Sequence, residues 1–325
     1  MSGLKVAVLG PIPADRVTTH HGRVLEKYGC VLYTTAALSA LMDHEDVICP
    51  VVHVRRQDEA EIRDQLGQFP NVDLSGVSSV ADQGDVVELT YADQNTRKES
   101  QTAFMAPILP EDVEPFLDAD CFLCVPITDY QVGLETLRYI KANSSGLVLL
   151  DGHGPTVSLA PGGQRFRRLW VDRDQWLPYV DILKLNLEEA GCSWFPASDE
   201  PLGAASGEPL TTADLPLFAA HCLDRGVSSV CVTLDEEGCS LYHHDEGGNL
   251  VEHLVDRLHV DDVVDTTGCG DSFAAGMAYG YLRTRDYVQA ARYGNAMGAQ
   301  RCAGSELAIY LPLEETDRQI HEAYS

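Results

Sequence analysis

Apolar runs of strand length alternate with helix-like stretches along most of the chain. The apolar runs are short and rich in residues that favour strands. They cover residues 5–10, 46–54, 121–126, 146–152, 181–186 and 228–235. Stretches with helical spacing lie between them, at 31–42, 59–69, 133–143 and 215–226. This alternation predicts an α/β fold of three layers, α/β/α, with a mostly parallel central sheet and helices on both faces.

Two stretches break this rhythm, because their apolar and polar residues alternate with the period of half-exposed antiparallel strands. They span residues 14–29 and 84–105. Both leave the same half of the chain, so we expect them to form a small β-sheet that acts as a lid on the main domain. Two ordinary surface hairpins are the alternative.

Length and composition fit one large α/β domain over residues 1–325. The chain is 45% hydrophobic, and no run of uncharged apolar residues is long enough to span a membrane. Its first ten residues resemble a strand more than a signal peptide, so we expect a cytoplasmic protein. Ten cysteines fit that compartment if they are reduced. The CxxC pair of Cys121 and Cys124 lacks a second pair at ligand spacing, so we interpret it as part of a buried strand.

The charge excludes some partners. Fifty acidic residues face 23 basic ones, for a formal net charge of -27. Such a surface repels nucleic acid and anionic membranes, so we expect neither as a partner. Acidic, lysine-poor proteins are typical of salt-loving cells, which suggests a halophilic host. An ordinary acidic protein is the alternative.

The stretch "DTTGCGDSF" at residues 265–273 carries the candidate chemistry. Phe273, Met277 and Tyr281 follow with helical spacing, so the glycines lie at a helix N-terminus. There Gly268 and Gly270 leave backbone N–H groups free to converge on an anion such as phosphate. Asp271, in the same turn, is either a helix-start residue or a general base beside that phosphate.

Two nucleotide-binding patterns do not fit this stretch. It begins like the dinucleotide pattern GxGxxG, but the sixth residue is Phe273 instead of glycine. The stretch also lies near the end of the chain, which disfavours a nicotinamide enzyme. The Walker pattern GxxxxGK[ST] is absent from the sequence.

With these residues, "DTTGCGDSF" resembles the C-terminal signature of the ribokinase-like (PfkB) carbohydrate kinases. Other segments resemble family motifs in the family's order, namely "GPIPAD" (10–15), "NLEE" (186–189), "VTLDEEG" (232–238) and "GNAMGA" (294–299). The resemblance spans nearly the whole chain. It implies a ribokinase-like fold with a small lid sheet, which in this family often pairs into a homodimer.

The resemblance also implies residue roles. Asp271 is the general base, and the N–H groups of Gly268, Cys269 and Gly270 hold the γ-phosphate of ATP. Asn186 and Glu189 organise Mg²⁺ through water. The remaining positions that border the nucleotide are Thr233, Asp235, Gly238 and Asn295. In some members an aspartate in the place of Asp265 contributes to a K⁺ site.

The acceptor side departs from the family pattern. Asp15 matches the aspartate that holds sugar hydroxyls. Tyr33 and Thr34 stand where the family often has an asparagine, and we expect them near the acceptor. Asp151 either assists there or caps a loop, and Lys184 either reaches phosphate or forms a salt bridge at the rim.

We therefore expect an ATP-dependent kinase that phosphorylates a hydroxyl of a sugar or sugar-like acceptor. Alternatives are a nucleoside kinase, a sugar-phosphate kinase and a ligand-binding regulator without catalysis. A phosphorylated acceptor would need cations, for which Arg97, Arg165, Arg167 and Arg168 are the candidates. The last three stand in one loop, and a solvated surface is the interpretation that we favour for them.

Overall fold

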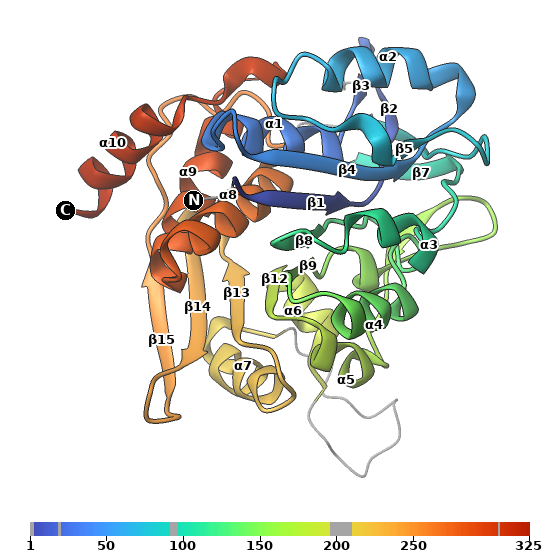
Figure 1. The fold of residues 1–325 in the computed structure, drawn as a ribbon. Coiled ribbons are helices and arrows are strands. Elements are labelled where there is room, and N and C mark those ends of the chain that lie inside the picture. Colours follow the sequence, from blue (N-terminus) through green and yellow to red (C-terminus); the bar gives the residue numbers. More distant parts are fainter. Residues whose placement is uncertain (1–2, 19–20, 92–96, 196–209, 305) are drawn as a thin grey trace.

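The structure is a computed structural model that describes residues 3–18, 21–91, 97–195, 210–304 and 306–325. Its centre is a nine-stranded sheet with the order β15-β14-β13-β12-β9-β8-β1-β4-β5 (Figure 1). Neighbours from β5 to β13 pair in parallel, while β14 and β15 pair in antiparallel at one edge. The predicted mostly parallel sheet is confirmed. The strands are β1 (Lys5–Leu9), β4 (Val47–His53), β5 (Val77–Ser78), β8 (Cys121–Cys124), β9 (Leu147–Asp151), β12 (Ile182–Asn186), β13 (Ser229–Thr233), β14 (Cys239–His244) and β15 (Leu250–Val255).

Helices cover both faces of this sheet, because successive residues of its buried strands point to opposite sides. In β1, Val6 and Val8 belong to one apolar core, and Ala7 and Leu9 belong to another. The first core also contains residues of α1 (Val31–Leu41), α2 (Arg56–Leu66), α8 (Cys269–Thr284) and α9 (Tyr287–Cys302). The second core contains residues of α3 (Pro110–Val113), α4 (Leu134–Asn143), α5 (Arg173–Trp176), α6 (Leu187–Ser193) and α7 (Leu215–Leu223). The C-terminal α10 (Leu313–Tyr324) packs on α9.

The two alternating stretches meet in a second, four-stranded sheet of order β3-β2-β6-β7, which we call the small sheet. Its strands are β2 (Ala14–Thr18), β3 (Val24–Tyr28), β6 (Val86–Tyr91) and β7 (Arg97–Ala103). Val17, Val87 and Leu89 form its own apolar cluster. The expected small sheet is therefore present, although residues 19–20 and 92–96 of these stretches lie outside the described residues.

A hairpin of β10 (Val157–Leu159) and β11 (Arg165–Arg167) extends beside the small sheet. The N–H of Gln101 in β7 donates to the carbonyl of Gly163 at 2.7 Å, which ties the hairpin to the small sheet. Across the described part of the chain, no helix is long and apolar enough to cross a membrane.

Candidate active site

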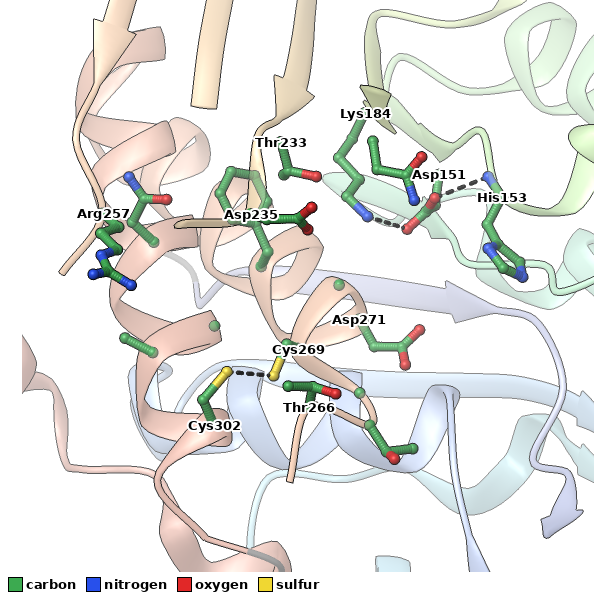
Figure 2. Close-up of a pocket in the computed structure, with 18 of the residues that line it drawn as sticks. Asp151, His153, Lys184, Thr233, Asp235, Arg257, Thr266, Cys269, Asp271 and Cys302 are labelled. Atoms are coloured by element: carbon green, nitrogen blue, oxygen red, sulfur yellow. Dashed lines mark hydrogen bonds and ion pairs between the residues drawn. The ribbon is translucent and has the colours of Figure 1, made fainter. Parts of the chain in front are cut away.

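A pocket with a volume of about 760 Å³ opens where the carboxyl ends of β9, β12 and β13 face the start of α8. Figure 2 shows Asp151 and Lys184 reaching from the strand ends toward the helix that carries Asp271. Open α/β sheets bind ligands at this end of their strands. Eleven residues predicted for the site line the pocket: Asp151, Asn186, Glu189, Thr233, Asp235, Gly238, Gly268, Cys269, Gly270, Asp271 and Asn295.

The predicted anion hole, which we define by the N–H groups of Gly268, Cys269 and Gly270, lies at the first turn of α8. Gly268 is the N-cap and has a φ of 83°, in the left-handed region that favours glycine. A Cβ added there would lie 2.4 Å from Cδ2 of Tyr33, so a side chain would also clash. The Cys269 N–H donates to the carbonyl of Thr266, in the preceding turn, at 3.3 Å. Gly268 thus lets the chain turn into α8 at the wall of the pocket, and the Cys269 N–H is engaged within that turn.

A lysine lies beside this hole. A Cβ on Gly270 would be 3.1 Å from Nζ of Lys184. The same Nζ donates to Oδ2 of Asp151 at 2.8 Å, and both side chains are almost fully buried. Lys184 therefore forms the predicted salt bridge, but in a buried position instead of at the rim. Contact between Lys184 and a phosphate stays a prediction.

The surroundings of Asp271 favour the protonated form of its carboxyl. Burial raises the pKa of its carboxyl to about 6, and the negative charge of Asp151 adds to this shift. The positive charges of Lys184 and His153 oppose it. A carboxylate with such a pKa is ionised at pH 7 and still accepts a proton readily.

Glu189 is fixed at the start of α6. Asn186 is the N-cap, its side chain accepts from the Glu189 N–H at 2.8 Å, and the Glu189 carboxylate accepts from the Asn186 N–H at 2.9 Å. Oε1 of Glu189 also lies 2.8 Å from Nδ1 of His153 and 3.2 Å from Nη2 of Arg167. Burial disfavours the charged form, but the hydrogen bond and charge of His153, with Lys184 and Arg167, hold the pKa of Glu189 below its usual range.

These carboxylates fit Mg²⁺ only in an outer role. Among the described residues, no group of three or more His, Cys, Asp and Glu side chains could hold a metal ion. Asp151 is paired with Lys184, and Glu189 with His153 and Arg167. Mg²⁺ is usually bound by few carboxylates together with water and substrate phosphates, so this donor set fits an ion that arrives with a nucleotide.

The far end of the pocket is built from the turn after β13. Asp235 has a φ of 49°, and Gly238 has a φ of 92° with a virtual Cβ only 2.1 Å from the Val255 carbonyl. Aspartate tolerates the left-handed region better than most other residues, which fits its presence at this turn. Asn295 donates to the carbonyls of Val255 and Asp256 at 3.2 and 2.9 Å, and so supports this wall.

Asp15 lies outside the residues that line this pocket. Its side chain is buried, and burial raises the pKa of its carboxyl to about 7 against the positive charges of Lys27 and Arg165. The charge of Asp271 is among the groups that act on it, so the two carboxylates belong to one electrostatic site. A Cβ on Gly29 would lie 2.9 Å from Oδ2 of Asp15, so a side chain at this position would force the Asp15 carboxylate to shift.

The two other predicted acceptor residues face protein. Tyr33 is 2% exposed, and its ring lies between Gly268 and the guanidinium of Arg301, whose Cζ is 4.5 Å from the ring centroid. Thr34 is fully buried, and its hydroxyl donates to the Cys30 carbonyl at 3.2 Å. The structure thus places Tyr33 behind the anion hole and Thr34 inside helix α1.

The carboxylate of Asp265 forms ion pairs with two cationic side chains, Lys27 and Arg301. Its Oδ2 lies 2.8 Å from Nζ of Lys27 and 3.2 Å from Nη2 of Arg301. Its Oδ1 accepts from the Thr267 N–H at 2.9 Å. Burial disfavours its charge, but the hydrogen bond from Lys27 and that N–H hold the pKa of Asp265 below its usual range. A carboxylate so satisfied is poorly suited to a K⁺ ion.

The three arginines for which the sequence favoured a solvated surface are instead paired within the protein, and Arg165 and Arg167 lie in strand β11. The Arg165 side chain is 7% exposed and lies near Glu99, Gln101 and His153. Arg167 pairs with Glu188 and Glu189, and Arg168 with Asp129. These partners come from distant segments, so the loop alone could not indicate them. The Arg97 side chain lies outside the described residues.

A second pocket, with a volume of about 880 Å³, lies between the small sheet and the hairpin. Strands β6 and β7, the hairpin and His153 line it. His153 borders both pockets. It was not predicted as a site residue, and neither were Arg257 and Cys302, which line the first pocket. The sequence feature that could have indicated His153 as a site residue is its position two residues after Asp151, at the end of strand β9.

Comparison with known proteins agrees with this geometry. Residues 159–312 match the model of the pfkB family carbohydrate kinases. An uncharacterized sugar kinase of Archaeoglobus fulgidus is 38% identical over 93 residues, 29% of this chain and 35% of that protein. A 2-dehydro-3-deoxygluconokinase of Bacillus subtilis is 39% identical over 148 residues, 45% of this chain and 40% of that protein. The matches thus span well under half the length of these curated relatives.

Solved structures resemble nearly the whole chain. A ribokinase of Arabidopsis thaliana complexed with ribose and ATP has a TM-score of 0.73 at 17% identity, over 98% of this chain and 99% of that one. A pyrophosphate-dependent kinase in the ribokinase family, complexed with a pyrophosphate analogue and myo-inositol, has a TM-score of 0.70 at 17% identity with the same coverage. These likenesses show the fold. The resemblance to the ribokinase-like (PfkB) carbohydrate kinases is therefore confirmed, and the chain has the ribokinase-like fold.

Proposed function

We propose that this protein is a kinase that transfers the γ-phosphoryl group of ATP to a hydroxyl of a sugar or sugar-like acceptor. One observation carries the proposal: a carboxylate with a raised pKa, Asp271, lies in the first turn of a helix whose N-terminus forms an anion hole, with Lys184 beside it. Phosphoryl transfer requires this combination of alignment and charge neutralisation. The sugar-kinase names of both curated relatives support the same class.

In the proposed reaction, Asp271 accepts the proton of the acceptor hydroxyl as its oxygen attacks the γ-phosphorus. The anion hole and the Lys184 ammonium stabilise the negative charge on the transferred group. Asp151 keeps Lys184 in place through the buried ion pair. Asp15 binds acceptor hydroxyls, and the small sheet acts as a lid that excludes water.

Mg²⁺ would neutralise phosphate charge when it is bound with the nucleotide. Asn186 and Glu189 would hold it through water, consistent with their fixed positions at the start of α6. K⁺ is not part of the proposal, because Lys27 and Arg301 already neutralise Asp265.

ATP is the proposed donor instead of pyrophosphate because the pocket continues well past the anion hole. Thr233, Asp235, Arg257 and Asn295 line this extension. A pyrophosphate donor would leave it without a ligand, whereas a nucleoside would fill it.

An acceptor with a free hydroxyl and no phosphate is favoured by the pairing of the arginines. Arg165, Arg167 and Arg168 all lie near carboxylates within the protein. Little positive charge is left to compensate a phosphorylated sugar. The name of the Bacillus subtilis relative makes 2-dehydro-3-deoxygluconate and related sugars the first acceptors to test.

A coupled assay for ADP release over sugars, sugar acids, sugar phosphates and nucleosides, run in high KCl, tests this function. We expect release that depends on one class of unphosphorylated acceptor. ATP binding without acceptor-dependent turnover would favour a non-catalytic regulator, and turnover with pyrophosphate alone would overturn the choice of donor.

We further propose that the protein is a homodimer joined through the small sheet. Val24 and Leu25 on the edge strand β3 are 46% and 37% exposed, which is unusual for apolar residues on an unpaired edge. Light scattering after size exclusion tests this, and a monomeric mass at micromolar concentration would contradict it.

A further inference from the structure

Two cysteines from different helices meet in the donor pocket. Sγ of Cys269 lies 2.8 Å from Sγ of Cys302 (Figure 2). Cys269 is the first residue of α8, and Cys302 is the last residue of α9. These two helices pack closely along their length, and both cysteines line the pocket that would hold the donor.

The protein backbone holds this pair in place. The carbonyl of Cys302 accepts from the N–H of Val264 at 2.8 Å, which attaches the segment before the anion hole to the end of α9. A disulfide requires a sulfur–sulfur distance of about 2.05 Å, so a shift of less than about 1 Å would suffice to close one. The two sulfurs already point at one another, and no large backbone movement is needed.

Both cysteines are partly exposed to solvent, and one of the two thiols has a lowered pKa. Seven of the ten cysteines are buried, whereas Cys192, Cys269 and Cys302 are partly exposed. The hydrogen bond between the two thiols lowers the pKa of Cys302, and the charge of Arg301 acts in the same direction against burial. Thiolate is the reactive form of cysteine, so Cys302 is the nucleophile of the pair.

We propose that Cys269 and Cys302 are a covalent modification site, at which a two-electron oxidant such as a peroxide forms a reversible disulfide that weakens donor binding. The Cys302 thiolate attacks one peroxide oxygen and forms an S–O bond as the O–O bond breaks, so that the transferred hydroxyl group makes it a sulfenic acid. The other oxygen leaves as hydroxide and takes up one proton to become water. The Cys269 thiol then attacks the sulfenic sulfur, and the second oxygen leaves as water. Overall, two thiols lose two electrons and two protons, one peroxide is reduced to two waters, and a dithiol reductant reverses the oxidation.

The effect on the donor follows from the position of Cys269. Cys269 stands between Gly268 and Gly270 in the proposed anion hole, and its side chain would be drawn toward α9 as the disulfide closes. The donor phosphates would then meet a displaced hole and a sulfur bridge in the pocket wall. This part rests on the proposed function, whereas formation of the disulfide does not.

The test uses the full chain, first reduced and then treated with hydrogen peroxide, with remaining thiols alkylated afterwards. Before alkylation, the intact mass should be lower by two hydrogens than that of the reduced protein. After alkylation, peptide mapping should find a cross-link between the peptides of Cys269 and Cys302. Saturating Mg²⁺–ATP should slow its formation. By calorimetry, the oxidised protein should bind ATP at least tenfold more weakly than the reduced protein, and dithiothreitol should restore binding.

Matched variants locate the effect. Each variant is compared with itself in the oxidised and reduced states, so that a change in basal affinity does not matter. Cys302→Ala and, as a second variant, Cys269→Ala should lose the cross-link and the change in ATP affinity, and Cys192→Ala should keep both. Absence of the cross-link overturns the modification site. A cross-link that leaves ATP affinity unchanged overturns the control of donor binding. If the protein forms the cross-link but does not bind ATP even when reduced, both the control of donor binding and the proposed kinase function are wrong. The modification site would still be supported.

Discussion

Nζ of Lys27 lies 2.8 Å from Oδ2 of Asp265, although 238 residues separate them in the sequence. Lys27 belongs to strand β3 of the small sheet, and Asp265 stands just before the anion hole. Both side chains are about three-quarters buried. The pair therefore connects the small sheet, which would cover the acceptor, to the segment that would hold the phosphate.

Breaking this connection should reduce turnover. We expect Lys27→Met to lower kcat by about tenfold, because the segment before the anion hole loses one of its two cations and small displacements of reacting groups cost rate. Steady-state kinetics measures this. Lys5→Met is the matched control, since Lys5 is equally buried and pairs with Asp118 away from the pocket. Equal kcat values in both variants would show that the Lys27 pair has no role in positioning.

Potassium should make no difference to the unmodified protein. Because Lys27 and Arg301 neutralise Asp265, we expect the same rate in KCl and in NaCl at equal concentration. Initial rates across a series of both salts measure this. A rate that requires K⁺ would show that the carboxylate of Asp265 does hold the ion.

Gly268→Ala should damage both stability and donor binding. A non-glycine residue in the left-handed region costs about 1–2 kcal/mol, and the new Cβ would also press against the ring of Tyr33. Denaturant unfolding and the KM for ATP measure the two effects. The control Gly191→Ala, where the added Cβ meets only ordinary contacts inside α6, should be neutral or slightly stabilising.

The sequence predicted the parts of the molecule that depend on local pattern. Short apolar runs indicated the parallel strands, and the glycines before Asp271 indicated a helix N-terminus. The sequence analysis does not predict strands β14 and β15, although Gly247 and Gly248 mark the turn between them. Ion pairs such as Lys27–Asp265 could not be predicted, because partners so far apart are chosen by the tertiary fold. The same holds for Arg165, Arg167 and Arg168, whose carboxylate partners come from other parts of the chain.

Removing the buried charge of Asp15 should stabilise the fold at neutral pH. The pKa of Asp15 is about 7 in the folded state, so between about pH 4 and pH 7 the folded state binds more protons than the unfolded state. The free energy of unfolding therefore falls as the pH rises through this window. Asp15→Asn avoids that loss, and it should raise stability at pH 8 by at most about 4 kcal/mol.

Unfolding curves at pH 5 and pH 8 test this relation. The advantage of Asp15→Asn should shrink at the lower pH, where wild-type Asp15 is largely protonated. The control Asp224→Asn changes an exposed carboxylate and should shift neither curve by more than about 0.5 kcal/mol. An Asp15→Asn variant that is less stable than wild type at pH 8 would show that the charged form is favoured in the fold.

Salt should stabilise the protein. With a net charge of -27, mutual repulsion of acidic groups opposes the compact state until ions screen it. We expect the melting temperature to rise by several degrees between low and molar KCl. A melting temperature independent of salt would speak against a halophilic host and favour an ordinary acidic protein.

The measurement that tests the central claim most directly is acceptor-dependent phosphoryl transfer by Asp271→Asn, with Asp224→Asn as control. If Asp271 is the general base, kcat should fall by about 10²–10⁴-fold while ATP binding remains within a few-fold of wild type. The wild-type rate should also decline as the pH drops below about 6, where Asp271 becomes protonated. Turnover by Asp271→Asn within a few-fold of wild type would contradict the assignment of this residue and the mechanism built on it.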